Sequence, residues 1–147
     1  MTTPVPDTPT AHAYVVDDDA ALRAELADTL AAAGLQVRTF PDGRAFLHEQ
    51  AMLPEGCVVL DVNMPGLSGR EVQDELRRTG SHHQIVMLTG AATVPLAVEA
   101  LHAGAADFIE KPMRPATLRQ AVMRALERLR QDQRARGRTA AAQRCLE

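Results

Sequence analysis

The chain has 147 residues, of which 46% are apolar, and a formal net charge of −3. This length suits one domain with one hydrophobic core, and the small net charge gives no reason to expect a nucleic-acid or membrane surface on its main body. No apolar stretch approaches the roughly 20 residues that span a bilayer, and two distant cysteines (Cys57 and Cys145) do not make a disulfide framework, so we expect a reducing, cytoplasmic setting.

The Thr/Pro-rich residues 1–11 lack the apolar centre of a signal peptide, and we expect them to form a flexible leader. Beyond them, apolar runs alternate with amphipathic stretches five times. The apolar runs predict strands over residues 13–16, 36–40, 57–60, 84–88 and 107–109. The amphipathic stretches predict helices over residues 20–33, 43–52, 69–78, 94–103 and from 115 to about 130, and Gly34 is a typical residue to end the first of them.

The composition changes after about residue 130. Residues 131–147 are rich in Arg, Gln and Ala and show no core-forming pattern. They predict a basic linker or helix extension that follows a domain over residues 12–130.

Five strands joined by helices predict a (βα)5 fold, an α/β doubly wound parallel sheet with helices on both faces. In such sheets the ligand site lies beyond the carboxyl ends of the strands. Only Pro41 and Asp42 follow the second strand, as expected of a strand at an edge. The polar residues that follow the other strands are expected to converge: Asp17 and Asp18, Asp61, Thr89, and Lys111.

Three of these converging residues are carboxylates. Carboxylates held close together repel one another, and an oxygen-rich cluster suits a hard cation such as Mg2+. Asp17, Asp18 and Asp61 therefore predict a Mg2+ site. The alternative is that Asp17 to Asp19 only cap the first helix, a role that suits Asp19.

The other two converging residues complete an anion site. A hydroxyl at Thr89 and an ammonium at Lys111, beside a metal, can hold the oxygens of a transferring phosphoryl group. The alternatives are a strand-end threonine that bonds its own backbone and a solvated lysine. Lys111 is the only lysine among 16 basic residues. Either this is chance, or this position needs a compact ammonium that the planar guanidinium of arginine cannot replace.

Four segments resemble the receiver domain of bacterial two-component response regulators: Val15-Val-Asp-Asp18, Leu60-Asp-Val-Asn-Met-Pro-Gly66, Met87-Leu-Thr-Gly90 and Phe108-Ile-Glu-Lys-Pro112. The resemblance covers roughly residues 13–129, and residues 88–112 resemble the FixJ-like subgroup in particular. It implies a flavodoxin-like strand order, 2-1-3-4-5. It also implies a protein that is not an enzyme, because it catalyses only its own phosphorylation and dephosphorylation.

The resemblance implies a role for each residue at the strand ends. Asp61 is the phosphoacceptor, and Thr89 and Lys111 bind the phosphoryl oxygens. Asp18 binds Mg2+ directly, and Asp17 does so directly or through water.

Three further roles follow from the resemblance. Asn63 lends the metal its backbone carbonyl. Phe108 matches the aromatic switch residue of the family, which turns inward as Thr89 moves toward the phosphoryl group, although a plain core phenylalanine is the alternative. The peptide bond between Lys111 and Pro112 is cis in relatives.

The partner implied by the resemblance is a sensor histidine kinase, whose phosphohistidine donates the phosphoryl group. His82 and His83 are not donors, and we expect both to be solvated loop residues. The expected output is transcription control through a C-terminal DNA-binding domain that is absent from this chain. The alternative is a free-standing receiver that acts by protein–protein interaction.

The predicted helix over residues 94–103 is more apolar than one buried stripe requires. We expect Val94 or Val98 to remain partly exposed near His102, Asp107 and Glu110. An exposed apolar stripe rimmed by polar groups is a candidate interface, and FixJ-like relatives dimerise through this helix and the following strand. We therefore expect a homodimer on phosphorylation, whereas a helix buried by neighbouring loops is the alternative.

Two other functions compete with this interpretation. A phosphohydrolase of the haloacid dehalogenase type also uses a nucleophilic aspartate with Mg2+, but it needs a second acid two residues later, where this chain has Asn63, and a cap domain for which this chain has no room. A degenerate receiver that only binds a protein partner would be expected to lack some of the five site residues.

Overall fold

The computed structural model describes residues 11–91 and 93–145, with side chains described only as far as Arg138. Strands and helices alternate along this part of the chain. The strands are β1 (His12–Val16), β2 (Gln36–Phe40), β3 (Cys57–Asp61), β4 (Gln84–Thr89) and β5 (Asp107–Glu110). The helices are α1 (Ala20–Ala32), α2 (Gly43–Glu49), the short 3-10 helix η1 (Gln50–Met52), α3 (Gly69–Arg78), α4 (Val94–His102) and α5 (Pro115–Cys145).

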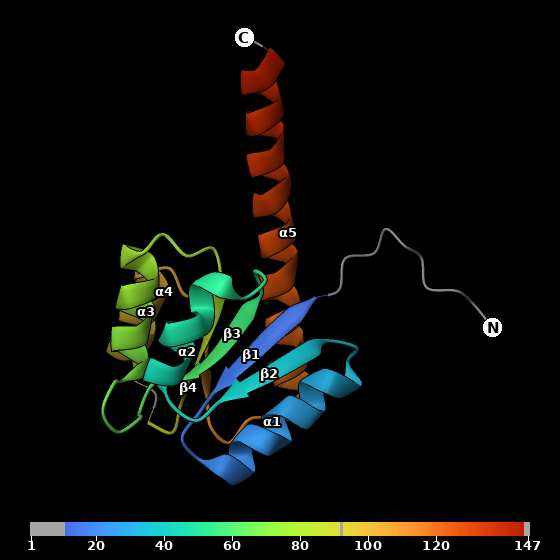
Figure 1. The fold of residues 1–147 in the computed structure, drawn as a ribbon. Coiled ribbons are helices and arrows are strands. Elements are labelled where there is room, and N and C mark those ends of the chain that lie inside the picture. The colour runs from blue at the N-terminus through green and yellow to red at the C-terminus, as the bar shows by residue number, and fades with distance from the viewer. Residues whose placement is uncertain (1–10, 92, 146–147) are drawn as a thin grey trace, which may run out of the picture.

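The five strands form one parallel sheet in the order β2-β1-β3-β4-β5. Helices cover both faces of this sheet (Figure 1). The (βα)5 fold, the doubly wound sheet, the strand order and the edge position of β2 are therefore confirmed. Since all strands are parallel, their carboxyl ends share one edge of the sheet.

Two hydrophobic cores lie on the two faces of the sheet. Along β1, Ala13 and Val15 belong to the core under α1 and α5, whereas Tyr14 and Val16 belong to the core under α2, α3 and α4. Side chains of a strand point alternately to opposite faces, so a central strand that is covered on both sides must be apolar throughout. All five residues of β3 are buried; the first four are apolar for this reason, and the fifth, Asp61, ends the strand at the edge of the sheet.

The predicted helix over residues 43–52 is two elements, α2 and η1. Leu53 has an extended backbone (φ −85°, ψ 145°) and its N–H donates to the carbonyl of Gln50 at 3.3 Å. A residue before proline is forced out of the helical region, and Pro54 follows Leu53. The chain therefore tightens into a 3-10 turn before β3. At the end of α1, Gly34 has φ of 91°, the left-handed conformation that its prediction as a helix stop requires.

The expectation that both loop histidines are solvated is wrong for His83. Only 9% of His83 is exposed, and its Nδ1 accepts the N–H of Gly56 at 3.2 Å. Its Nε2 lies 3.0 Å from the carbonyl of Gln50 and must donate, because Nδ1 accepts. The ring packs edge-on against Tyr14, and burial lowers the pKa of the imidazole below its usual value. His82 is exposed, as expected.

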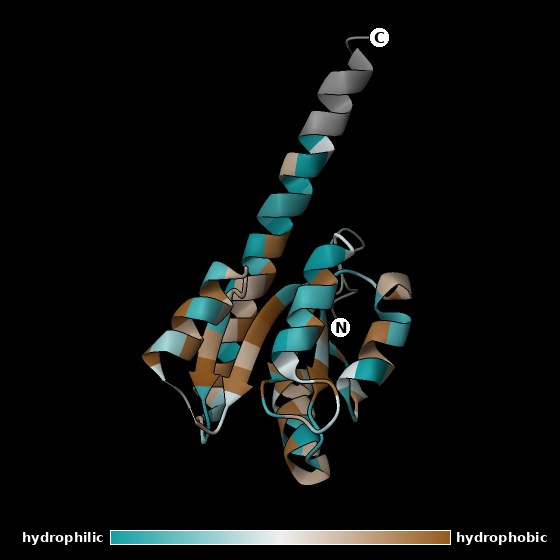
Figure 2. Cartoon of the chain, turned by 90° about the vertical axis from the view of Figure 1, so that its left-hand side faces the viewer, coloured by the Kyte–Doolittle hydropathy of each residue, from teal (hydrophilic) through white to brown (hydrophobic). Residues whose placement is uncertain are grey.

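The final helix continues well beyond residue 130, as α5 runs without interruption from Pro115 to Cys145. Its first half buries an apolar stripe against the sheet (Leu118, Val122, Leu126 and Leu129), and its second half projects past the sheet (Figures 1 and 2). Among the described residues, no helix is long and apolar enough to cross a membrane. Residues 1–10 of the expected leader lie outside the described part. Its last residue, Ala11, accepts a backbone hydrogen bond from Gln36 at 2.9 Å.

Candidate functional site

An acidic cluster lies at the carboxyl edge of the sheet. Asp17 and Asp18 follow β1, and Asp61 is the last residue of the neighbouring strand β3. Each of the three side chains offers an oxygen, and these atoms all lie within 4.8 Å of one another. Asp17 and Asp61 are 1% and 4% exposed, whereas Asp18 is exposed. The convergence predicted from the strand ends is thus present in the structure.

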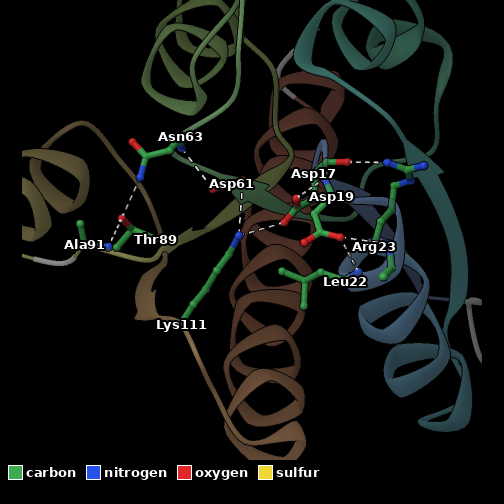
Figure 3. Close-up of polar contacts among 10 residues, drawn as sticks. Asp17, Asp19, Leu22, Arg23, Asp61, Asn63, Thr89, Ala91 and Lys111 are labelled. Carbon is green, nitrogen blue, oxygen red and sulfur yellow. Dashed lines mark hydrogen bonds and ion pairs between the residues drawn. The ribbon is translucent and has the colours of Figure 1, made fainter.

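Local hydrogen bonds hold the β1 end of the cluster. Asp17 Oδ1 accepts the N–H of Asp19 at 2.9 Å, and its backbone carbonyl accepts Arg23 Nη1 at 2.7 Å (Figure 3). Asp19 caps α1 by accepting the N–H groups of Ala21 and Leu22. Asp19 is therefore the residue that caps the helix, and the carboxylates of Asp17 and Asp18 remain directed to the cluster.

Asp61 is held by the loop that follows it and by α3. Its Oδ1 accepts the N–H of Asn63 at 3.1 Å. The first residue of α3, Gly69, packs so closely on the strand end that an added Cβ would lie 2.3 Å from the carbonyl oxygen of Asp61. The N–H of Gly69 donates to the carbonyl of Val62 at 3.0 Å. A residue without a side chain is thus required where the helix approaches the acceptor.

Lys111 links the two sides of the cluster. Its Nζ lies 3.2 Å from Asp17 Oδ2 and 3.4 Å from Asp61 Oδ2 (Figure 3). Burial, together with repulsion from Asp17, raises the pKa of Asp61, although Asn63 and Lys111 oppose this shift. Burial lowers the pKa of Lys111, but its hydrogen bonds and attraction to Asp17 and Asp61 outweigh burial and raise the pKa. Lys111 therefore stays charged and compensates part of the carboxylate repulsion.

Thr89 ends β4 beside the cluster and is fully buried. Its Oγ1 accepts the N–H of Ala91 at 3.1 Å and the side-chain amide of Asn63 at 3.4 Å (Figure 3). This amide contact was not predicted from the sequence, which gave a role only to the backbone carbonyl of Asn63. The position of Asn63, two residues after Asp61 in a loop at the strand ends, was the available signal.

The donor set fits a hard divalent cation. All three side chains offer oxygen atoms, the ligands that such cations prefer. Among the described residues, the carboxylate of Asp18 makes no hydrogen bond or ion pair, although it faces two other carboxylates. The cluster could therefore hold a metal ion, and a cation bound to it would relieve the repulsion that Lys111 compensates only in part.

Comparison with known proteins identifies the family. The model of the response regulator receiver domain matches residues 13–123. The chain belongs to this family.

The relatives of this receiver domain include transcription regulators. It is 46% identical over 115 residues to the transcriptional regulatory protein FixJ of Azorhizobium caulinodans, covering 78% of this chain and 54% of that protein. It is 50% identical over 101 residues to FixJ of Bradyrhizobium diazoefficiens, covering 69% of this chain and 49% of that protein. The chain thus spans about half the length of these curated relatives.

A solved structure supports the same relationship. The response regulator StyR superposes with a TM-score of 0.85 at 33% identity, over 92% of this chain and 69% of that one. The resemblance to FixJ-like receivers that the sequence motifs indicated is therefore confirmed.

The remaining residues singled out in the receiver domain lie on β5 and α4. Phe108 is half-buried and lines a small cavity of about 30 Å3 beside Leu96 and Ala100 of α4, so it is neither a fully buried core residue nor a solvated one. The bond between Lys111 and Pro112 is cis, as expected.

The outer side of α4 is exposed in the receiver domain. Val94 is 78% exposed and Val98 is 45% exposed, so the expectation that they remain accessible is confirmed. His102 and Glu110 are also exposed, and Asp107 is half-buried. Ala100 is the only buried residue of α4. The alternative, a helix covered by neighbouring loops, is excluded.

Proposed function

We propose that this receiver domain accepts a phosphoryl group on Asp61 from the phosphohistidine of a sensor histidine kinase, in a Mg2+-dependent reaction, and then changes conformation to control an output. The observation that supports this proposal is the convergence of Asp61 with Asp17, Asp18, Thr89 and Lys111 at one edge of the sheet. We also propose the cytosol as its compartment, because its two distant cysteines suit a reducing setting.

The proposed reaction is a single transfer of a phosphoryl group. A carboxylate oxygen of Asp61 forms a bond to phosphorus as the bond between phosphorus and the imidazole nitrogen of the donor breaks, and the imidazole leaves with the electron pair. Such transfers depend mainly on positioning and on electrostatic stabilisation. Hydrogen bonding from Asn63 holds one oxygen of Asp61, and Lys111 favours the charged form of the acceptor.

The residues that would hold Mg2+ are Asp17, Asp18 and Asp61 through carboxylates and Asn63 through its backbone carbonyl. When bound, Mg2+ would neutralise the negative charge of the phosphoryl oxygens. The Lys111 ammonium and the Thr89 hydroxyl would bind the same oxygens from the β4 and β5 side. In doing so Lys111 would exchange its present ion pair with Asp61 for the phosphoryl group.

Phosphorylation changes only a few oxygens at the strand ends. An element with two conformations must therefore transmit this change to the surface of the domain. Thr89 leads into the loop before α4, and Phe108 lies under that helix. We propose that movement of Thr89 toward the phosphoryl group lets Phe108 turn inward. The surface of α4 and β5, with Val94, Val98 and His102, then becomes the interface of a homodimer.

The output proposed for the whole protein is transcription control. Its curated relatives are named transcriptional regulatory proteins and are about twice as long as the matched part of this chain. DNA would be bound through a C-terminal domain of the whole protein. The receiver itself is proposed to catalyse only its own phosphorylation and dephosphorylation. A free-standing receiver that acts through protein partners is the alternative.

The test is the variant Asp61→Asn, labelled from acetyl phosphate with Mg2+. The amide keeps the size of the side chain but cannot form the acyl phosphate, so we expect no acid-labile, hydroxylamine-sensitive label and an unchanged circular dichroism spectrum. Asp42→Asn is a matched control, because Asp42 caps α2 and lies outside the cluster. Full labelling of Asp61→Asn would overturn the assignment of the acceptor.

A further inference from the structure

The charge of the chain is unevenly distributed. Residues 128–147 contain six arginines against Asp132 and Glu147, a net charge of +4, whereas the rest of the chain carries −7. Charge asymmetry of this kind points to a polyanionic partner for the basic part. In the structure, residues 128–145 of this basic segment lie in the second half of α5, which projects past the sheet (Figures 1 and 2).

One side of this segment is anchored to the domain. Glu55, which lies just before β3, accepts Arg136 Nη1 at 3.0 Å and Arg136 Nη2 at 2.6 Å, and also the amide of Gln133 at 3.2 Å. The hydrogen bonds from Arg136 lower the pKa of Glu55 to about 2. One turn earlier, Asp132 accepts the amide of Gln84 at 3.4 Å. These contacts lie on the side of α5 that its first half packs against the sheet, so the opposite side of the helix faces away from the domain.

Three arginines occupy the opposite side. Arg130, Arg134 and Arg138 recur every four residues, so at about 100° per residue they fall within an arc of about 80°, and at about 1.5 Å per residue they span about 12 Å. All three are exposed. Within the described part of the chain, Arg134 and Arg138 have no ion-pair partner, and Arg130 has only a long, exposed contact with Glu127 at 3.6 Å. We call these three residues the arginine face.

We propose that the arginine face of α5 binds the phosphate backbone of duplex DNA, without reading its sequence. The choice of DNA as the polyanion rests on the proposed function in transcription control. Three guanidinium groups in a row over about 12 Å extend along three to four phosphate repeats of one strand, each about 3.4 Å along the duplex axis. Arginine also suits phosphate oxygens better than lysine does, because its planar fork can donate two parallel hydrogen bonds.

The chemistry of the segment disfavours two other partners. A helix that lies on a membrane needs large apolar side chains on one face, and Ala135 is the only apolar residue of 130–138. A second copy of this chain offers acidic residues, but many of its carboxylates already have ion-pair partners: Glu49, Glu55, Asp74, Glu75, Glu99 and Asp107. The phosphates of DNA form a continuous row of negative charge whose counterions are mobile and are released on binding.

The experiment measures binding of this chain to a fluorescent duplex by anisotropy as a function of salt. Each neutralised phosphate contributes about −0.9 to the slope of log K against log salt, so three predict a slope of about −2.7, an affinity loss of about 500-fold for a tenfold rise in salt. We expect the triple variant Arg130→Gln, Arg134→Gln, Arg138→Gln to lose most of this slope.

A matched control removes three arginines elsewhere. The variant Arg44→Gln, Arg77→Gln, Arg78→Gln changes the net charge equally at exposed positions of α2 and α3, and it should keep the slope of the unaltered chain. Helicity should be unchanged in both variants, because glutamine is nearly as good a helix former as arginine.

Several outcomes would overturn the proposal. These are an unaltered chain that shows no salt-dependent binding, an arginine-face variant that binds DNA as well as the unaltered chain, and a control variant that loses the slope equally. Loss of binding to anionic vesicles but not to DNA would assign the face to a membrane, and loss of a self-associated species in sedimentation would assign it to a second copy. Asp61 labelling in the arginine-face variant should be normal. A failure of the phosphoacceptor assignment would therefore appear in the labelling experiment and not in the DNA-binding experiment.

Discussion

Replacement of Gly69 by alanine tests how closely α3 must approach the acceptor. The new Cβ would lie 2.3 Å from the carbonyl oxygen of Asp61 and 2.8 Å from Cα of Val62. Both neighbours are backbone atoms, so no side chain can turn away, and the helix or the strand end must move by about 1 Å to restore an ordinary contact. Such overpacking typically costs about 1–3 kcal/mol.

Two measurements follow from that displacement. The unfolding entropy is about 2.1 cal/mol/K per residue, or about 0.3 kcal/mol/K for 147 residues. Division of the overpacking cost of about 1–3 kcal/mol by this entropy gives a Tm lower by about 3–10 °C. A displacement of about 1 Å at a reacting group can slow a reaction about 100-fold. We therefore expect Gly69→Ala to melt earlier in calorimetry and to label Asp61 from acetyl phosphate more slowly by up to about that factor.

Gly137→Ala is the matched control, because it makes the same chemical change at a position where, among the described residues, no atom beyond the glycine's own stretch of helix lies within 4 Å of the added Cβ. Gly137 lies inside α5, where alanine is favoured over glycine by about 1 kcal/mol. The control should not melt earlier and should label normally. If Gly69→Ala has the Tm and the labelling rate of the unaltered protein, the close approach of α3 is not required for stability or for positioning the acceptor.

Four further predictions concern the metal, the lysine, the dimer and pH. EDTA should abolish labelling from acetyl phosphate and Asp18→Ala should nearly do so, while Asp18→Ala raises Tm because a repelling carboxylate is removed. Lys111→Arg should lose labelling or the dimerisation that follows it, because a bulky fork replaces a compact ammonium between two carboxylates. Val98→Asp should leave labelling intact but prevent beryllofluoride from converting monomer to dimer in sedimentation, because it puts a charge into the exposed apolar surface of α4. The pKa of His83 is lowered in the folded state, so the unfolded state takes up a proton first as pH falls. Stability should therefore be full above the ordinary histidine pKa of about 6.5 and decline below it, and His83→Gln should flatten that decline in calorimetry at several pH values.

Each of these has a contrary result. Undiminished labelling in EDTA would remove the metal from the mechanism, and an unchanged Tm of Asp18→Ala would remove only the claim about repulsion. If Lys111→Arg matches the unaltered protein in labelling and dimerisation, the single lysine has no special role. A Val98→Asp protein that dimerises normally would move the interface elsewhere. An identical pH profile of His83→Gln would show that another group controls stability in that range.

Much of the fold and of the candidate site was predictable from the sequence alone. The five strands and their order follow from local patterns and from the resemblance, since the period of apolar residues depends on the backbone conformation of each segment. The rule that parallel strands share one carboxyl edge then predicts that Asp17, Asp61 and Lys111 lie close together. The exposure of Val98 on α4 followed from counting more apolar residues than one buried stripe can hold.

Only the tertiary structure could decide features that depend on distant parts of the chain. The burial of His83 depends on Gly56 and Gln50, which lie 27 and 33 residues away, and no local pattern encodes that contact. The amide of Asn63 reaches Thr89 only because β3 and β4 pair in register. The rotation of the second half of α5 could not be read from residues 131–147, because they have no apolar stripe of their own. It is set by the first half of the same continuous helix, which buries Leu118, Val122, Leu126 and Leu129 against the sheet. Glu55, 81 positions before Arg136, pairs with that arginine on the same side of the helix.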